Sequence, residues 1–209
     1  MCGIAGLIGF EYPENKISKI IREIQSSLNH RGPNWKGFWT SKEDKISLIH
    51  TRLSILDLSK DGNQPMNSSC GRYKIVFNGE IYNHLNLRRM LKSNKYNIKW
   101  KSTSDTETLL ECVSAIGVNK TISYLRGMFA FSLFDRKNKK IYLIRDRYGE
   151  KPLYLLDLKN GKFAFSSDIA SFSFVPEFSP NLDLKAASCF FQRGYIAAPM
   201  SIWKNVKKI

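Results

Sequence analysis

Apolar residues recur along this chain with two periods, and each period predicts a different kind of element. A helical spacing of three, one, three and four residues relates five apolar positions: Ile17, Ile20, Ile21, Ile24 and Leu28. Such spacing gathers apolar side chains on one face of a helix. We therefore predict an amphipathic helix over 15–29, terminated by the Gly32-Pro33 pair.

Strand patterns occupy much of the remaining chain. Short apolar runs predict strands at 3–9, 46–50 and 73–77. From residue 128 four more strand-like runs follow, separated by turns rich in Lys, Asn and Gly: MFAFSLFD, KIYLIRD, PLYLL and KFAFSS. The Asn78-Gly79 pair, between YKIVF and EIY, predicts a tight hairpin turn.

Three more helices are predicted between and after these strands. A short one covers 84–92, and helical character returns around 183–192. Ser104 and Glu107 have the spacing of a capping box, which opens a helix that Gly117 ends. Most links between strands are short, which favours antiparallel pairing. The predicted fold class is therefore α+β, with sheets covered by helices and no internal repeat or clear domain boundary.

The composition limits size, compartment and metal binding. The 209 residues are 43% hydrophobic and 12% aromatic, which suits one large domain or two small ones. No run of 18 apolar residues occurs, so no membrane partner is expected. The first residues lack the basic region of a signal peptide, which points to a cytoplasmic location. The four cysteines are scattered, and they form no metal-ligand spacing with the three histidines.

The net charge of +15 raises the hypothesis of a nucleic-acid partner. The lysines, however, stand singly or in short groups along the whole chain, and the aromatic residues fall mostly in strand patterns. Dispersed charge of this kind indicates a solvated surface more than a specific target. We therefore expect no nucleic-acid partner.

Cys2 directly follows the initiator methionine. A small second residue generally lets methionine aminopeptidase remove Met1, which would leave a cysteine with a free α-amine. The reference pKa of that amine is about 7.7–8.0, so part of it is an unprotonated base near neutrality. One residue would then supply a nucleophile and a proton acceptor. The alternative is that Cys2 is an incidental small residue before a buried strand.

Other polar residues could complete such a site for an amino-acid amide. Asn78 and Gly79 could donate hydrogen bonds to an oxyanion, although the pair could equally be only a turn. Arg52 could bind a carboxylate with two hydrogen bonds. Glu80 and Asp105 could bind an ammonium group, although Asp105 also suits a helix N-terminus.

Eight motifs occur in one order from residue 1 to about 155: MCGIAGLIGF, HRGPN, HTRLSILDL, GNQPM, FNGEIYNH, SDTE, LRGMFAFSLFD and RDRYGEKPLYL. Together they resemble the glutaminase domain of glutamine-hydrolysing asparagine synthetases, which are class II glutamine amidotransferases. The resemblance implies the N-terminal-nucleophile hydrolase fold, an αββα sandwich of two mainly antiparallel sheets. The segment Leu53-Ser54-Ile55-Leu56-Asp57 and the GNQPM motif favour this subfamily over other class II enzymes.

The resemblance also implies roles for individual residues. Cys2 would form a thioester with the glutamine acyl group, with its own α-amine as the general base. Asn78 and Gly79 would form the oxyanion hole. Substrate binding would fall to these two and to seven further residues: Arg52, Leu53, Ser54, Ile55, Leu56, Glu80 and Asp105. The HRGP and RDR motifs would be mainly structural or channel-facing.

Two positions depart from the family pattern. Asn34 stands where aspartate is usual after HRGP, and Glu150 stands where an aliphatic residue is usual before Lys151-Pro152. Neither position belongs to the implied catalytic set. The first would change a local ion pair, and the second would change surface or interdomain packing.

The resemblance covers a glutaminase but not a synthetase. The Ser-Gly-Gly phosphate loop of the synthetase domain is missing. We therefore expect one domain over 1–209, with a core to about 195 and the start of a linker at 196–209. No cofactor is expected in this chain, since ATP and Mg²⁺ would bind the absent synthetase domain or subunit.

The expected partners are L-glutamine and that synthetase part, and the full-length enzyme could form a homodimer. The expected use of the ammonia is amidation of aspartate to asparagine. Two alternatives stay open: amidation of another carboxylate, such as a sugar acid of a surface polysaccharide, and a non-catalytic basic binding module.

Overall fold

Ten strands form two sheets in the computed structural model of this protein, which describes all residues 1–209. One sheet has the order β10 (Val206–Lys208), β8 (Tyr154–Asp157), β9 (Phe163–Ser166), β1 (Gly3–Ile8), β3 (Ile46–Arg52), β2 (Trp35–Ser41). The other has the order β4 (Met66–Asn67), β5 (Tyr73–Ile81), β6 (Gly127–Asp135), β7 (Lys140–Arg145). All neighbouring strands are antiparallel, as the short links predict.

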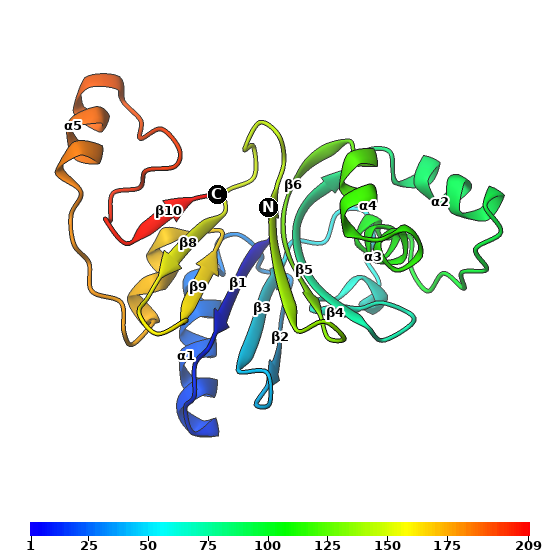
Figure 1. Ribbon diagram of the computed structural model, residues 1–209, viewed down its shortest axis with the longest axis horizontal. Helices are drawn as coiled ribbons and strands as arrows, with labels where there is room; N and C mark the ends of the chain where they lie inside the picture. The colour runs from blue at the N-terminus through cyan, green and yellow to red at the C-terminus, as the bar shows by residue number, and fades with distance from the viewer.

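The two sheets face each other, and helices cover their outer surfaces (Figure 1). The layer between the sheets is apolar because both sheets contribute buried side chains to it, among them Ile4, Leu48, Val76, Ala130 and Phe165. A second apolar cluster lies between the four-stranded sheet and its helices, and a third lies between the six-stranded sheet and its helices. The result is the four-layer αββα arrangement that the resemblance implies.

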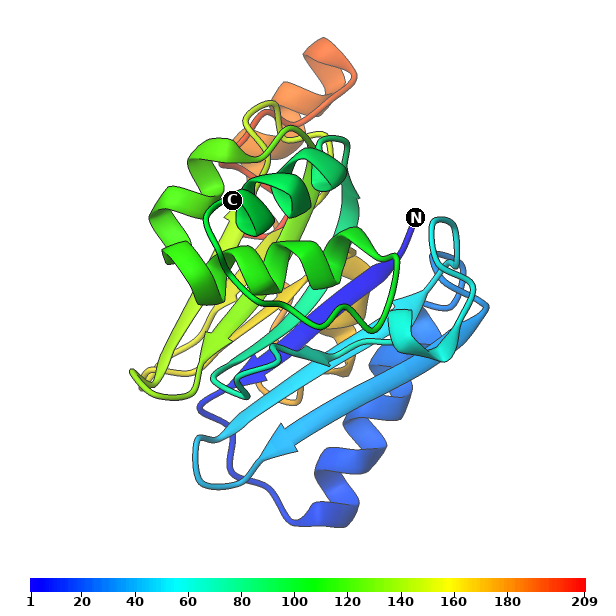
Figure 2. The same ribbon diagram turned by 90° about the vertical axis from the view of Figure 1, so that its right-hand side faces the viewer.

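The helices divide between the two sheets. The six-stranded sheet is covered by α1 (Glu14–Ser27) and the 3-10 helix η2 (Ile169–Phe174). The four-stranded sheet is covered by α2 (His84–Ser93), α3 (Asp105–Ile116) and α4 (Val118–Tyr124), as Figure 2 shows. A short 3-10 helix, η1 (Lys60–Gly62), follows β3, and α5 (Leu184–Arg193) projects beside β10. None of these helices is both long and apolar enough to cross a membrane.

Most predicted elements are confirmed. The helix predicted over 15–29 is α1, and the regions predicted around 84–92 and 183–192 are α2 and α5. The strand patterns likewise correspond to strands of the two sheets. Several elements were not predicted: the strands β2, β4 and β10, the helix α4 and the two 3-10 helices. β2 and α4 have mixed exposure rather than a clear apolar period, and the others are too short to show one, so the sequence signal for them is weak.

The predicted hairpin turn at Asn78-Gly79 is wrong. β5 runs through this pair without interruption, and its partner is β6, some fifty residues later in the chain. Gly79 lies opposite Phe129, and a Cβ atom on Gly79 would come within 2.3 Å of the carbonyl oxygen of Met128. The glycine therefore serves close backbone approach inside a sheet, which local sequence cannot distinguish from a turn.

Only one of the two hydrogen bonds of the predicted capping box forms. The Ser104 hydroxyl caps α3 by accepting from the Thr106 N–H at 3.0 Å. The Glu107 carboxylate does not return to Ser104, because it accepts from the N–H groups of Lys101 and Ser102, both at 2.9 Å. Glu107 thus holds the loop that precedes α3.

The segment predicted as the start of a linker contributes to the sheet. Val206–Lys208 forms the edge strand β10 beside β8. The Ile209 N–H then bonds the carbonyl of Leu153, and Arg145 donates to the carbonyl of Ile209 at 2.8 Å. The predicted domain boundary at about 195 stays a prediction, but the last four residues pack on the domain.

Candidate active site

One cavity joins the N-terminus, the loop after β3, the second half of β5 and the start of α3. Nine of the ten predicted site residues line it: Cys2, Arg52, Leu53, Ile55, Leu56, Asn78, Gly79, Glu80 and Asp105. Ser54 alone is outside the lining. The tertiary fold therefore gathers residues that lie up to about a hundred positions apart in sequence.

Cys2 stands at the start of β1, beside the loop that follows β3. Its Sγ lies 3.4 Å from the backbone nitrogen and 3.6 Å from the carbonyl oxygen of Leu53. Burial raises the pKa of the Cys2 thiol, while the Leu53 backbone and the Arg52 charge act in the opposite direction. The thiol therefore needs an adjacent base if it is to react as a thiolate near neutral pH.

Met1 lines the same cavity. Its sulfur lies 3.6 Å from Lys151 Nζ and 3.9 Å from Arg31 Nη2. Arg31 also donates to the Cys2 carbonyl at 3.2 Å. Two cations thus flank the N-terminal residue, and removal of Met1 would enlarge the cavity beside Lys151.

The outer edge of β5 points backbone groups into the cavity. The Phe77 N–H donates to Gln64 Oε1 at 2.6 Å, and the Ile81 N–H donates to Asp105 Oδ2 at 2.8 Å, so both point away from β6. Backbone groups alternate sides along an antiparallel strand. The N–H of Gly79, midway between these two, therefore points to the same side, where β4 no longer covers the edge.

Asn78 adds a second donor to this place. The residue is 1% exposed, and its Nδ2 has no hydrogen-bond partner in the protein. A buried polar group without a partner costs free energy, so such groups in native proteins call for an explanation. A ligand oxygen in the cavity would supply the missing acceptor.

The guanidinium of Arg52 is fixed in place but keeps its charge uncompensated. It donates to three neutral oxygens: the carbonyl of Asp57, the carbonyl of Ser59 at 2.7 Å and Oδ1 of Asn63 at 2.7 Å. No carboxylate contacts it. The nearby Asp57 carboxylate instead accepts from Ser59 and Thr103. A buried, oriented guanidinium of this kind suits a carboxylate ligand.

Asp105 is the first residue of α3 and supplies a buried carboxylate. Burial raises its pKa to about 6, against the Ile81 hydrogen bond, and the neighbouring Glu80 charge raises it further. Two carboxyl groups in a confined space favour a cationic ligand between them. Arg52 and this pair thus present opposite charges to one cavity.

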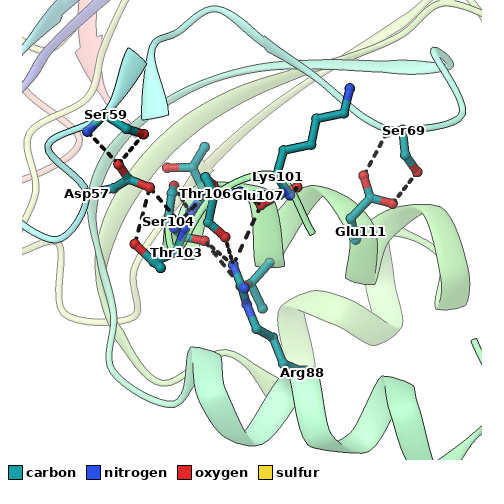
Figure 3. A network of polar contacts seen from close by, with 12 residues as sticks. Asp57, Ser59, Ser69, Arg88, Lys101, Thr103, Ser104, Thr106, Glu107 and Glu111 are labelled. Atoms are coloured by element: carbon teal, nitrogen blue, oxygen red, sulfur yellow. Dashed lines mark hydrogen bonds and ion pairs between the residues drawn. The ribbon is translucent and has the colours of Figure 1, made fainter. Parts of the chain in front are cut away.

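A polar network fixes the start of α3 (Figure 3). Arg88 donates to the carbonyls of Ser102 and Ser104 at 3.0 Å and lies 3.7 Å from the Glu107 carboxylate. On the other side, Asp57 ties Thr103 to the loop that follows β3. The network therefore locks the position of Asp105 relative to Arg52.

Ser54, which lies outside the cavity lining, forms a hydrogen bond with Asn34. The Ser54 N–H donates to Asn34 Oδ1 at 3.0 Å, which anchors the Leu53–Leu56 segment from outside the cavity. An aspartate would offer the same acceptor. The departure from the family pattern at residue 34 therefore preserves the contact that shapes this loop and removes only a charge.

Three residues of the GNQPM motif support the site, and the sequence analysis missed their roles. Gly62 makes room for Arg52, since a Cβ there would lie 2.3 Å from Nη2. Asn63 accepts from Arg52, and Gln64 joins Phe77 to Thr106. His50, neutral because burial lowers its pKa to about 3, completes the support through the carbonyl of Phe77 at 3.2 Å. The GNQPM motif marks these residues in the sequence, but it does not show which residues they contact.

No group of three or more His, Cys, Asp or Glu side chains is arranged to hold a metal ion. The polar atoms of the cavity are instead a thiol, amide and backbone donors, one guanidinium and two carboxyl groups. This set can bind a zwitterionic amino acid and place an electrophilic carbon near the thiol.

Comparisons with known proteins show the family to which the chain belongs. The chain matches the family described as the glutamine amidotransferase domain over residues 1–209. The glutamine-hydrolyzing putative asparagine synthetase 2 of Methanocaldococcus jannaschii is 35% identical, and the match covers 100% of this chain and 42% of that protein. Glutamine-hydrolyzing asparagine synthetase 1 of Bacillus subtilis is 31% identical, with 100% and 32% covered. The chain thus spans less than half the length of these relatives.

In three dimensions the chain is similar to the glutamine phosphoribosylpyrophosphate amidotransferase of Bacillus subtilis, solved in complex with ADP and GMP. The TM-score is 0.69 at 20% sequence identity, and the match covers 87% of this chain and 45% of that one. The likeness shows the fold, which is the N-terminal-nucleophile hydrolase sandwich that the sequence resemblance implies.

Proposed function

This chain belongs to the glutamine amidotransferase domain family, and on that premise we propose that it hydrolyses L-glutamine to glutamate and ammonia through the thiol of Cys2. The observation that carries the proposal is the unpartnered Nδ2 of Asn78, buried in the cavity that also contains Cys2. A donor held ready without an acceptor fits an oxyanion that exists only during reaction.

The proposed chemistry begins after removal of Met1. The α-amine of Cys2 takes the thiol proton, and the sulfur attacks the δ-carbon of glutamine. The carbonyl electron pair moves to oxygen, where Asn78 Nδ2 and the Gly79 N–H stabilise it. Collapse of the intermediate breaks the C–N bond, and the amine proton leaves with the nitrogen as ammonia. Water then hydrolyses the thioester and regenerates the thiol.

Substrate orientation follows from the two charged ends of the cavity. We assign the α-carboxylate of glutamine to Arg52 and its α-ammonium to Glu80 and Asp105. The Leu53–Leu56 segment would line the space between them. Each charged contact is worth on the order of 1.5–3 kcal/mol when it is desolvated. Together they would select an amino acid over a simple amide.

The proposed use of the ammonia is ATP-dependent amidation of aspartate in a synthetase domain or subunit. Support comes from the names of the relatives, which are glutamine-hydrolyzing asparagine synthetases longer than this chain. ATP and Mg²⁺ would bind in that second part. L-Glutamine and the synthetase part are therefore the proposed partners of this domain.

The direct test is to incubate the processed protein with glutamine, aspartate, Mg²⁺ and ATP and to assay glutamate, asparagine and AMP separately. We expect glutamate and ammonia without ATP, and no asparagine or AMP from this chain alone. Asparagine formed by these 209 residues would contradict the proposal that amidation of aspartate takes place in a separate synthetase part. Absence of glutamate, even with a synthetase part supplied, would overturn the glutaminase proposal.

Glutamine binding is expected to weaken at acidic pH. The carboxyl group of Asp105 has a pKa raised to about 6, so it loses its charge as the pH falls through that value. KM for glutamine should therefore rise by up to about tenfold per pH unit below pH 6 and level off above pH 7. Measurement of KM from pH 5 to 8 checks this. Asp105→Asn should start with a high KM and show no such rise.

A further inference from the structure

Lys151 is a buried cation in the cavity for which the proposed chemistry has no role. The residue is 7% exposed, and it lines the cavity together with Met1 and Cys2. The single hydrogen bond from its Nζ goes to the sulfur of Met1 at 3.6 Å, and no carboxylate forms an ion pair with it. A buried lysine usually has an anionic partner. Removal of Met1 would leave this ammonium facing the new N-terminus.

Lys151 follows a turn that is held by several hydrogen bonds. The Asp146 carboxylate accepts from four backbone N–H groups: those of Phe129, Tyr148, Glu150 and Lys151. Arg145 donates to the carbonyls of Gly149 and Lys151, the latter at 2.6 Å. Both flanks of Lys151 are therefore held by the RDR motif. The backbone from which the buried Lys151 side chain extends is therefore fixed by the fold.

We propose that Lys151 is a positioning residue whose ammonium disfavours protonation of the α-amine of Cys2 and so keeps that amine available as the general base. The inference rests on the proposed function, because it requires the amine that Met1 removal exposes. The amine nitrogen lies five covalent bonds from the Met1 sulfur. With bond lengths of about 1.5 Å, this puts Lys151 Nζ within roughly 10 Å of it.

Other charges face the same amine, and their sum decides the effect. Arg31 lies on the loop after α1 and Arg52 at the end of β3, while Glu80 on β5 and Asp105 on α3 oppose them. The formal charges of these four sum to zero. Lys151 therefore brings the formal sum of the five charges to +1, and because its side chain is buried, salt screens it less than a surface charge at this distance. The expected lowering of the amine pKa is about 0.5–1 unit.

The experiment compares processed wild-type protein with Lys151→Met, which keeps the length of the side chain, and Lys151→Arg, which keeps the charge. Lys159→Met, at an exposed turn, is the matched control. kcat at saturating glutamine is measured from pH 5.5 to 9.5. A titration of the ¹³Cα shift of Cys2 follows the amine without any need for activity.

For Lys151→Met we expect the acidic limb of kcat to move up by about 0.5–1 pH unit, with a roughly three- to tenfold loss at pH 6.5 and recovery near pH 9. The amine titration should move by the same amount. Lys151→Arg and Lys159→Met should keep both near wild type. A uniform loss at every pH, or an unmoved amine titration, would overturn this role. An inactive wild type with a shifted amine would instead contradict the glutaminase proposal alone.

Discussion

Cys2→Ala is expected to abolish glutamine hydrolysis, leaving a rate indistinguishable from that of buffer. We expect the variant to keep the fold because the hydrogen bonds of the Cys2 side chain go only to the backbone of Leu53. It removes the one thiol in the cavity. Cys2→Ser should also be severely impaired, since a hydroxyl is a far weaker nucleophile near neutral pH than a thiol beside an amine. Glutamate release from both variants, measured beside wild type, checks this.

Covalent labelling identifies the nucleophile independently of the rate. Diazo-oxo-norleucine, an electrophilic analogue of glutamine, should modify Cys2 after loss of Met1. Cys70 is exposed but lies outside the cavity, and burial raises the pKa of Cys112 to about 12, so its thiolate is scarce. Cys189 also lies elsewhere, on α5. Label on any of these three, or Met1 retained on active protein, would contradict the assignment.

Asn78→Ala is expected to lower kcat by about 10²–10³ with little change in KM. The Asn78 amide has no partner before reaction, so its loss affects the oxyanion far more than bound glutamine. Arg52→Ala serves as the contrast, because it removes a partner of the substrate carboxylate and should raise KM about ten- to a hundredfold. Steady-state kinetics of both variants separate the two roles.

Stability measurements on the same two variants distinguish a loss of catalysis or binding from a loss of folded protein. Asn78 is buried in β5, and the guanidinium of Arg52 holds the loop after β3. Thermal unfolding should therefore be followed for each. Equal losses in kcat with unchanged KM would show that the two roles are assigned wrongly. A large drop in stability with proportional loss of active protein would show that the residues act through the fold.

The sequence by itself determined the kinds of element and the identity of the candidate chemistry. The helical spacing of Ile17, Ile20 and Ile24 predicted α1 because an amphipathic helix must bury one face wherever it packs. Motifs in fixed order pointed to Cys2 and Arg52 because motif resemblance carries information about a family that periodicity does not. These inferences need only local pattern and order along the chain.

The tertiary structure decided everything that depends on partners distant in sequence. Asn78-Gly79 has the local composition of a turn, but pairing with β6 makes it part of a continuous strand. That pairing aims the Gly79 N–H into the cavity and leaves the Asn78 amide unpartnered. Glu107 likewise was predicted to cap α3, but its carboxylate instead accepts a hydrogen bond from the loop that precedes the helix.

The burial of charged residues also depends on partners distant in sequence. The raised pKa of Asp105 and the isolation of the Lys151 ammonium arise from what surrounds these residues in space, and their surroundings come from separate elements. A sequence names the charged residues but cannot show which of them share a cavity away from water. The reason is physical, since desolvation and Coulomb interactions depend on distance in the folded chain and not on separation along it.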